Sequence, residues 1–367
     1  MVACWWCVPY LHHIFCISTY LSADSVTENQ FFSLSCLLWP HVIATPDYTK
    51  GSFDRAWPQH LYLNPASPLL EDDAHVLITG HRAGQEARRR IELPEGFDIA
   101  KTPLVSFRRI DLLFSPKEIE TMHRELHPEY YQANASFKLY GTKAVWSSSP
   151  EDYLDVFTQD VPLGRYRTMV VSTAGHWTLE LFKGYDVEGA NTENGGPVYG
   201  YDGLLTFFRE AMEKWVGIVQ KRLDEANVKL DSAGASAGSW KGYPPSRVMG
   251  QPKERKMEVV VRAYLPGHED CHSHREAWTS ILPFQRNLYN WHLIDKYNEV
   301  FEVGTFTPFL LQEDGIDQPL IQKLLMPATT KTSNIHYLPI DRPGRLRPDA
   351  VRFPLSQIVP YPFSRRL

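Results

Sequence analysis

Apolar and polar residues follow two different periods along this chain, and the periods predict its elements. Runs rich in β-branched residues predict buried strands at 13–21, 103–114, 166–173, 257–265 and 335–340. Apolar positions at helical spacing predict helices at about 25–38, 204–224 and 287–302. Strands that alternate with helices in this way predict an α/β fold, a three-layer sandwich around a mostly parallel sheet with long loop insertions.

The ends of these elements carry local signals. Ser25 and Glu28 have the spacing of a capping box at the start of the first predicted helix. Ser115-Pro116 begins a further short helix, and Asp202 is expected to cap the helix at 204–224. The apolar stripe of that helix is expected to lie in the core, and it consists of Leu205, Phe208, Met212, Trp215, Val219 and Leu223.

The amino-acid composition limits the classes of protein to which this chain can belong. The chain has 367 residues, of which 43% are hydrophobic, so it can bury a large core. Its net charge of −5 and the lack of a long basic run argue against a nucleic-acid partner. Five cysteines, an odd number, do not predict a disulfide framework. Segments 46–100, 183–203 and 231–256 are rich in Pro, Gly or polar residues and predict loops.

The first 22 residues carry no Asp, Glu, Lys or Arg. The basic start of a signal peptide is therefore missing, and Pro9 and the His12-His13 pair interrupt the apolar run. We expect residues 1–22 to form an atypical apolar N-terminus that includes the first strand. Membrane association through this segment stays open. The predicted organisation continues with one α/β domain at 23–350 and a separate tail at 351–367.

Ser25 stands where the first predicted strand gives way to the first predicted helix. A serine here can be an ordinary helix cap. It can also be a nucleophile, because the free N–H groups of a helix start can hold an oxyanion. Gly175 and His268 also follow predicted strand ends, and the carboxyl ends of parallel strands meet at one edge of a sheet. These residues are therefore expected to come together.

The string "ADSVTENQFFSLSCLL" resembles the first block of the trichome-birefringence-like/PC-esterase family, within the SGNH (GDSL-type) superfamily. The family form is Gly-Asp-Ser, followed by Asn-Gln and Ser-Leu-x-Cys-Leu-Leu; here the first Gly is Ala23. "MVVSTAGHW", "VVVRAYLPGHEDC", "NLYNWHLIDKYNEVFE" and "IHYLPIDRPGRLRPDA" resemble later blocks in the same order, so the resemblance spans about residues 23–350.

The resemblance implies an SGNH-like fold and acyl transfer to or from carbohydrate hydroxyls. Ser25 would be the nucleophile, with Asp24 as its motif neighbour. Asn29, Gly175 and His176 would lie at the oxyanion and cleft side, and Trp177, Arg262 and His268 in a substrate loop. No cofactor is implied beyond an acyl donor such as acetyl-CoA or an acetylated carrier. The family is usually anchored in the Golgi, which implies the secretory pathway.

The acid and base of the family's triad come from a final Asp-x-x-His block. No such block follows Ala350, because residues 351–367 contain no Asp, Glu or His. His336 is the nearest candidate base, although Ser333 stands three positions before it. We therefore expect impaired catalysis, from a misjoined gene product or from a protein that has lost catalysis and kept its ligand cleft. Whether this chain is an active enzyme stays open.

Two other readings of the chain follow from these residues. A non-catalytic carbohydrate-binding protein on the same fold would need no base, and a lipase-like GDSL esterase would need no sugar. The cluster "GHEDCHSH" at 267–274 holds His and Cys residues of metal-ligand type. A structural zinc site usually needs two spaced ligand pairs, and a second pair is not evident, so no metal is predicted.

Overall fold

The computed structural model describes residues 18–23, 25–46, 58–70, 93, 96–143, 145–160, 166–187, 196–236, 256–265, 273–274, 276–281, 291–302 and 334–346. The chain divides into two compact units. The first unit comprises residues 1–261 and 328–336, and the second comprises residues 262–327 and 337–367.

The strands of the described residues form one sheet in the order β2-β3-β4-β1-β5-β6-β7. Strand β1 (Ser18–Ala23) lies between β4 (Val105–Arg109) and β5 (Tyr166–Ser172) and runs parallel to both. Strand β6 (Glu258–Arg262) runs parallel to β5, and β7 (Ile335–Leu338) is the last strand in this order. The sheet is mostly parallel, as the sequence predicts.

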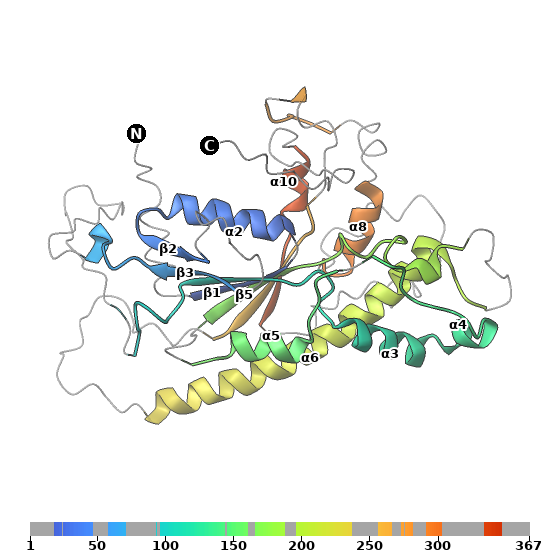
Figure 1. Cartoon of the computed structure of the whole chain (residues 1–367), viewed down its shortest axis with the longest axis horizontal. Coiled ribbons are helices and arrows are strands. Elements are labelled where there is room, and N and C mark those ends of the chain that lie inside the picture. The colour runs from blue at the N-terminus through green and yellow to red at the C-terminus, as the bar shows by residue number, and fades with distance from the viewer. Residues whose placement is uncertain are drawn as a thin grey trace, which may run out of the picture. The chain divides into compact units, whose positions relative to one another are not determined.

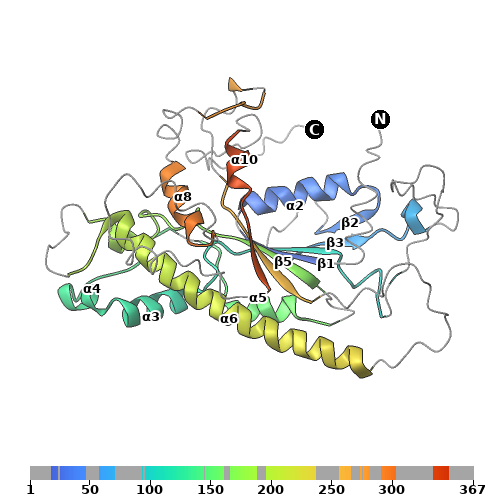
Figure 2. The same cartoon turned by 180° about the vertical axis from the view of Figure 1, so that it is seen from behind.

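Helices lie on both faces of the central strands. Helix α2 (Ser25–Leu37) covers one face, and α5 (Pro150–Phe157) and α6 (Gly200–Ser236) cover the other (Figure 1). Figure 2 shows the same arrangement from behind. The predicted α/β sandwich of three layers is confirmed.

The core between α2 and the sheet follows from the apolar stripe of the helix. Phe31 of α2 lies against Phe107 of β4, with ring centroids 5.8 Å apart. Both side chains are fully buried. Leu38 and the strand residues Val42, Leu61, Leu63 and Val105 complete this cluster. Such burial of large apolar side chains is the main force that holds α2 on the sheet.

The core on the opposite face is aromatic. Tyr20 of β1 stacks on Phe157 of α5, with ring centroids 6.4 Å apart. Trp215 of α6 donates its Nε1–H to the hydroxyl of Tyr153, 2.6 Å away. That hydroxyl donates in turn to the backbone oxygen of Leu113 at 2.9 Å. The buried polar atoms of Trp215 and Tyr153 are therefore satisfied, as such rings require inside a protein.

Helix α6 is longer than the sequence predicts. It begins at Gly200 rather than at an Asp202 cap, and it ends at Ser236 rather than near 224. Gly203 packs so closely that an added Cβ would lie 1.8 Å from the oxygen of Val198. Towards the other end, Asn227 donates to the oxygen of Met257 and accepts from its N–H, at 3.2 and 2.7 Å. These tertiary bonds extend the helix beyond its predicted stripe.

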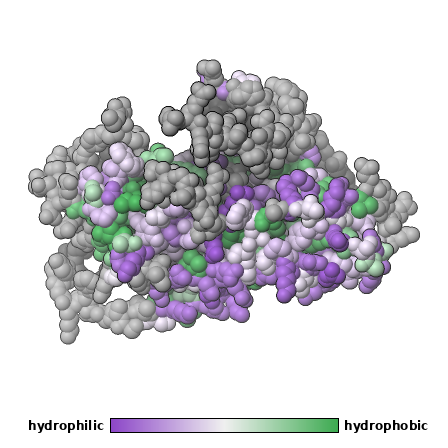
Figure 3. All heavy atoms as spheres, viewed as in Figure 1, coloured by the Kyte–Doolittle hydropathy of each residue, from purple (hydrophilic) through white to green (hydrophobic). Residues whose placement is uncertain are grey.

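The predicted stripe itself is mostly correct. Five of its six residues are fully buried: Phe208, Met212, Trp215, Val219 and Leu223. Leu205 is half-buried, and its neighbour Leu204 takes the fully buried place. Hydrophilic residues predominate on the described surface over α3 and α6 in the view of Figure 3. This division between an apolar and a polar face is typical of a helix that packs on one side only.

Other elements lie partly inside segments predicted as loops. Strands β2 (Val42–Thr45) and β3 (Gln59–Leu63) pair antiparallel with each other, and β3 pairs antiparallel with β4. A short 3-10 helix, η1 (Pro68–Leu70), follows β3. These strands are short and lie at the sheet edge, so their sequence pattern is weak. Within 46–100, which was predicted to be rich in loops, β3 and η1 are regular elements that the sequence did not predict, and β2 ends directly before that segment.

Three short helices complete the first unit. Helix α3 (Pro116–Leu126) begins with the predicted signal, a capping box between Ser115 and Glu118. Helix α4 (Pro128–Ala133) follows it after one residue. The 3-10 helix η2 (Lys183–Tyr185) precedes α6 in the chain. Neither α4 nor η2 has an apolar run long enough to be predicted from sequence.

The second unit contains α8 (Trp291–Glu299) and α10 (Asp341–Arg345). Arg345 joins them, because its guanidinium pairs with Asp295 of α8 and lies 3.2 Å from Oδ2 of Asp341. The same guanidinium stands over the ring of Trp291, 5.5 Å from its centroid. A helix was predicted at 287–302, and the described part of it begins at Trp291.

Candidate functional site

The turn at Ser25 lies at the edge of the sheet where the central strands end. Strand β1 ends at Ala23, and Ser25 is the first residue of α2. Ala23 pairs with Arg109 of β4 and with Ser172 of β5, which are the last residues of those strands. The segments that follow all three strands therefore leave the sheet at the same edge. The structure describes the backbone of Ser25, while its side chain and Asp24 lie outside the described residues.

Asp111 is the acidic residue that β4 delivers to this edge. Its side chain is completely buried. Oδ2 accepts the backbone N–H of Trp146 at 3.0 Å, and Oδ1 accepts Nε–H of Arg109 at 3.2 Å. The same Oδ1 stands 3.3 Å from Nε2 of His176. A buried carboxylate costs free energy unless it is paired, and these three groups compensate its charge.

The segment after β5 brings His176 to Asp111. Thr173 donates its hydroxyl to the backbone oxygen of Asp111 at 3.0 Å. Ala174 has a φ of 136°, in a region that residues with a Cβ rarely adopt. The N–H of Trp177 then closes a turn onto the oxygen of Ala174 at 2.8 Å. This turn leaves 24% of the His176 side chain exposed.

Asp111 was not among the residues that sequence reasoning selected. A signal for it exists, because an acidic residue ends the apolar run "PLVSFRRI" and precedes "LLF". An isolated charge in such a run is usually paired in the fold. Its partner could not be read from the sequence, since Asp111 and His176 are far apart in the chain. Gly175 and His176 were selected, and the structure places both directly after β5.

Three further residues were predicted to belong to the site, namely Asn29, Arg262 and His268. Asn29 is exposed on α2 and lies one turn after Ser25, so the two share one face of the helix. Arg262 is buried at the end of β6. His268 lies outside the described residues, as do the other His and Cys residues at 268–272.

Trp177 is a core residue, which corrects its placement in a substrate loop. It is 0% exposed and stacks on Phe182, with ring centroids 4.8 Å apart. Phe208 of α6 meets it edge-on at 5.0 Å. A ring enclosed in this way has no open face for a sugar. Trp39, directly after α2, is 73% exposed.

His336 does not lie where a base for Ser25 would be needed. It stands within β7, and β5 and β6 separate that strand from β1. Three strand spacings correspond to about 14 Å across the sheet. Its Nε2 is 3.8 Å from Oε2 of Glu258, at the beginning of β6. The proposal of His336 as the base is therefore wrong on distance.

A serine–histidine contact lies inside the sheet. Ser106 of β4 is 2.5 Å from Nδ1 of His60, its antiparallel partner on β3. The Ser106 hydroxyl also bonds the hydroxyl of Tyr166 at 2.6 Å. Ser106 is 0% exposed, and burial lowers the pKa of His60 to about 4. No substrate can reach this hydroxyl, so the contact serves the packing of three strands.

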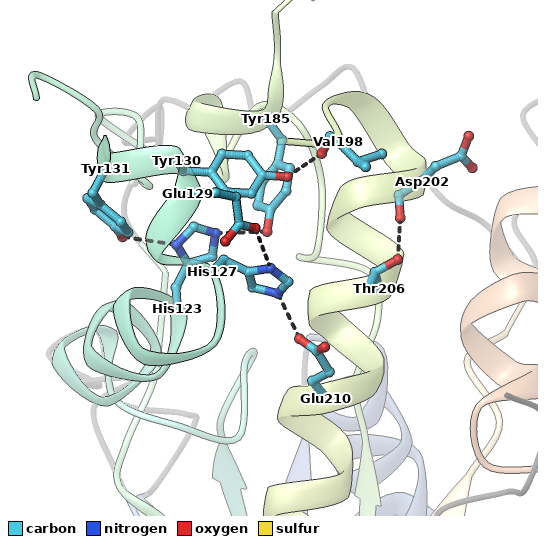
Figure 4. Close-up of polar contacts among 10 residues, drawn as sticks. All are labelled: His123, His127, Glu129, Tyr130, Tyr131, Tyr185, Val198, Asp202, Thr206 and Glu210. Carbon is cyan, nitrogen blue, oxygen red and sulfur yellow. Dashed lines mark hydrogen bonds and ion pairs between the residues drawn. The ribbon is translucent and has the colours of Figure 1, made fainter. Parts of the chain in front are cut away.

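A further cluster of titratable groups joins α3, α4 and α6 (Figure 4). His123 is fully buried, with Nδ1 2.9 Å from the hydroxyl of Tyr131 and Nε2 2.9 Å from the hydroxyl of Tyr185. Burial lowers the pKa of His123 to about 3, with smaller contributions from the charges of His127 and Arg124. His123 is therefore a neutral ring in the folded protein.

His127 lies beside it, with ring centroids 5.2 Å apart, and has the opposite character. Its Nδ1 is 3.1 Å from Glu129 and its Nε2 is 2.7 Å from Glu210 of α6. Burial alone would lower the pKa of His127, but the hydrogen bonds and charges of Glu210 and Glu129 outweigh it and raise the pKa. The cluster therefore holds two adjacent imidazoles whose pKa values are shifted in opposite directions.

Comparison of the chain with protein-family models, with curated proteins and with solved structures gives no match. Within the described ranges, none of the helices combines the length and the apolar character needed to cross a bilayer. The same ranges contain no group of three or more His, Cys, Asp or Glu side chains that could hold a metal ion.

Proposed function

We propose that this protein transfers acyl groups, most simply acetyl, to or from carbohydrate hydroxyls through an acyl-enzyme on Ser25. The observation that carries the proposal is the position of Ser25 at the first turn of α2, between the carboxyl ends of β4 and β5. In open α/β sheets this edge is where ligands bind. Asp111 and His176 are the ionisable pair that the two flanking strands bring to it.

The start of α2 suits the charge that develops in acyl transfer. The first N–H groups of a helix have no partner within the helix, and the helix dipole places partial positive charge there. These groups can stabilise the oxyanion of a tetrahedral intermediate, a contribution of about 3 kcal/mol for one good donor. The backbone at Gly175, after the neighbouring strand, is the second proposed donor.

The carbohydrate part of the proposal rests on the resemblance of the Ser25, Gly175 and Arg262 blocks to the PC-esterase family. The acyl donor would be acetyl-CoA or an acetylated carrier. The proposed setting is the secretory pathway, which the same resemblance implies. A tryptophan near the first block could stack on a sugar ring, and Trp39 is exposed there, whereas Trp177 is enclosed.

The test is covalent labelling of the purified full chain with a fluorophosphonate, read by intact and peptide mass spectrometry. We expect one label on Ser25, and release of acetate from an acetylated oligosaccharide that falls about 1,000-fold or more in Ser25→Ala. Ser33→Ala is the matched control, because Ser33 lies on the same helix and donates only to the oxygen of Asn29, 2.9 Å away. A chain that shows neither Ser25 labelling nor Ser25-dependent acetate release would disprove the proposal.

A non-catalytic carbohydrate-binding protein is the second candidate function. It is favoured by one observation, that His336 lies too far from Ser25 to serve as the base of the family pattern. In that case oligosaccharide binding would survive Ser25→Ala, and no acyl-enzyme would form. A lipase-like esterase would be recognised by turnover of short acyl esters with no preference for sugars.

A further inference from the structure

We infer that His176 is the general base for Ser25 and that Asp111 is the residue that positions it, in place of the Asp-x-x-His block of the family pattern. This inference rests on the proposed function. Its foundation is the placement of the two residues. Asp111 follows β4 and His176 follows β5, and these strands flank β1 on either side. The pair therefore lies at the edge where Ser25 begins α2.

The hydrogen-bonding capacity of His176 fits a base. A neutral imidazole has one N–H donor and one acceptor nitrogen. Nε2 lies 3.3 Å from Oδ1 of Asp111, within ion-pair distance. With Nε2 on the Asp111 side, Nδ1 is the nitrogen that we infer to accept a proton. Among the described residues, Nδ1 has no hydrogen-bond partner. The side chain is 24% exposed, so a hydroxyl group or a substrate can approach it.

Asp111 is fixed well enough to orient the imidazole. Its side chain is 0% exposed, and both of its oxygens accept hydrogen bonds, from Arg109 and from the N–H of Trp146. Its backbone oxygen accepts the hydroxyl of Thr173, which belongs to the same turn as His176. One hydrogen bond and one ion-pair contact thus connect the segment after β4 with the segment after β5. A carboxylate held in this way stabilises an imidazolium without becoming protonated.

The backbone beside His176 is strained. Ala174 has a φ of 136°. Only glycine adopts such a φ without steric cost. Strain of this kind costs free energy and persists only where the surrounding structure imposes it. In this turn it accompanies the contact of His176 with Asp111. A turn that served only to connect β5 with the following segment would not require it.

The chemical step is then balanced as follows. Nδ1 of His176 takes the proton of the Ser25 hydroxyl as Oγ bonds to the acyl carbon, and the carbonyl electron pair moves to oxygen. Collapse of this intermediate breaks the bond between the acyl carbon and the leaving atom of the donor, an oxygen in an ester or the sulfur in acetyl-CoA, and that atom receives the proton from His176. A sugar hydroxyl or water next gives its proton to Nδ1 and attacks the acyl carbon. The second collapse returns the proton and the electron pair to Ser25.

The test measures the second-order rate of Ser25 labelling by a fluorophosphonate as a function of pH. We expect His176→Ala to lower the rate about 100-fold or more. Added imidazole should restore part of the rate in this variant and leave the rate of the native chain unchanged. Asp111→Asn preserves the shape of the side chain. It should lower the rate, because the imidazolium loses the carboxylate that stabilises it.

His336→Ala is the control, because this exposed histidine lies in the same sheet but away from Ser25. Its labelling rate should equal that of the native chain. Ser25 labelling that is unchanged in His176→Ala, or a loss of labelling in that variant that added imidazole does not restore, would overturn the inference alone. A native chain whose Ser25 does not react would instead overturn the proposed function.

Discussion

Two regions of this protein pair histidine with carboxylate, and they differ in what the second ring nitrogen does. At the edge of the sheet, His176 faces Asp111 through Nε2 and keeps Nδ1 without a partner among the described residues. Between the helices, His127 has a carboxylate at each nitrogen, Glu129 and Glu210. His176 therefore keeps one ring nitrogen that can accept a proton, whereas a carboxylate lies beside each ring nitrogen of His127.

The difference decides the charge of each ring. Only an imidazolium can donate from both nitrogens, so the surroundings of His127 favour its protonated form. His123 next to it faces two tyrosine hydroxyls, which can donate or accept, and its burial favours the neutral form. Neither ring can exchange a proton without breaking a packed contact. A histidine–carboxylate pair is therefore a catalytic candidate only where one nitrogen remains available.

The largest expected effect is a difference in stability. Truncation of histidine to alanine should lower the free energy of unfolding much more at His123 than at His176. His123→Ala should lower the free energy of unfolding by about 3 kcal/mol, because it leaves a cavity and removes the partner of the buried Tyr185 hydroxyl. His176→Ala should lower it by less than about 1 kcal/mol, since the ring is partly exposed. Urea unfolding followed by tryptophan fluorescence measures both. Equal losses would remove the distinction between a packed and an available ring.

A smaller effect is expected from pH. The pKa of His127 is raised in the folded state above its ordinary value of 6.5. Its stabilising contribution is therefore complete below pH 6.5 and is lost as the pH rises through the folded value. We expect about 1 kcal/mol, discounted because Glu210 and Glu129 are more than one-third exposed.

Glu210→Gln isolates this contribution. The variant should lose part of its unfolding free energy at pH 6.5 and match the native chain more closely at pH 8.5. The charged and titratable groups around His127 are His123 and Arg124 from α3, Glu129 and Tyr130 from α4, and Glu210 from α6. A difference between native and variant chains that does not change between the two pH values would contradict a protonated His127.

The smallest effect is expected for an exposed ion pair between the same helices. Nζ of Lys214 on α6 is 3.5 Å from Oε2 of Glu125 on α3, and both side chains are more than 40% exposed. Lys214→Gln should change the unfolding free energy by less than about 0.5 kcal/mol. The same unfolding experiment measures it. A loss as large as that of Glu210→Gln would show that location between the helices, and not burial of His127, determines the effect.

Local patterns predicted much of this fold. The capping box at Ser115 and Glu118, the strand at 166–173 and the core face of α6 follow from short-range signals and occur as predicted. The same reasoning missed β2 and β3, whose few residues pair at the edge of the sheet. It also ended α6 too early, because Asn227 is held by Met257, a residue remote in sequence.

The candidate site divides in the same way. Ser25, Gly175 and His176 could be selected because each follows a strand, which is a local property. Trp177 and His336 were misplaced, since motif order does not reveal whether a ring is enclosed or how many strands separate two residues. Asp111 was overlooked because its meaning depends on His176, which only the pairing of β1 with β4 and β5 brings near.

The sequence by itself determined the α/β class, the strand-to-helix turn at Ser25 and the apolar faces that bury the core. These depend on residue types at periods of two and 3.6, which are written along the chain. Only the tertiary structure decided which histidine meets which carboxylate. Such pairs depend on strand order and on burial, which arise when distant segments share one core and which no local pattern contains.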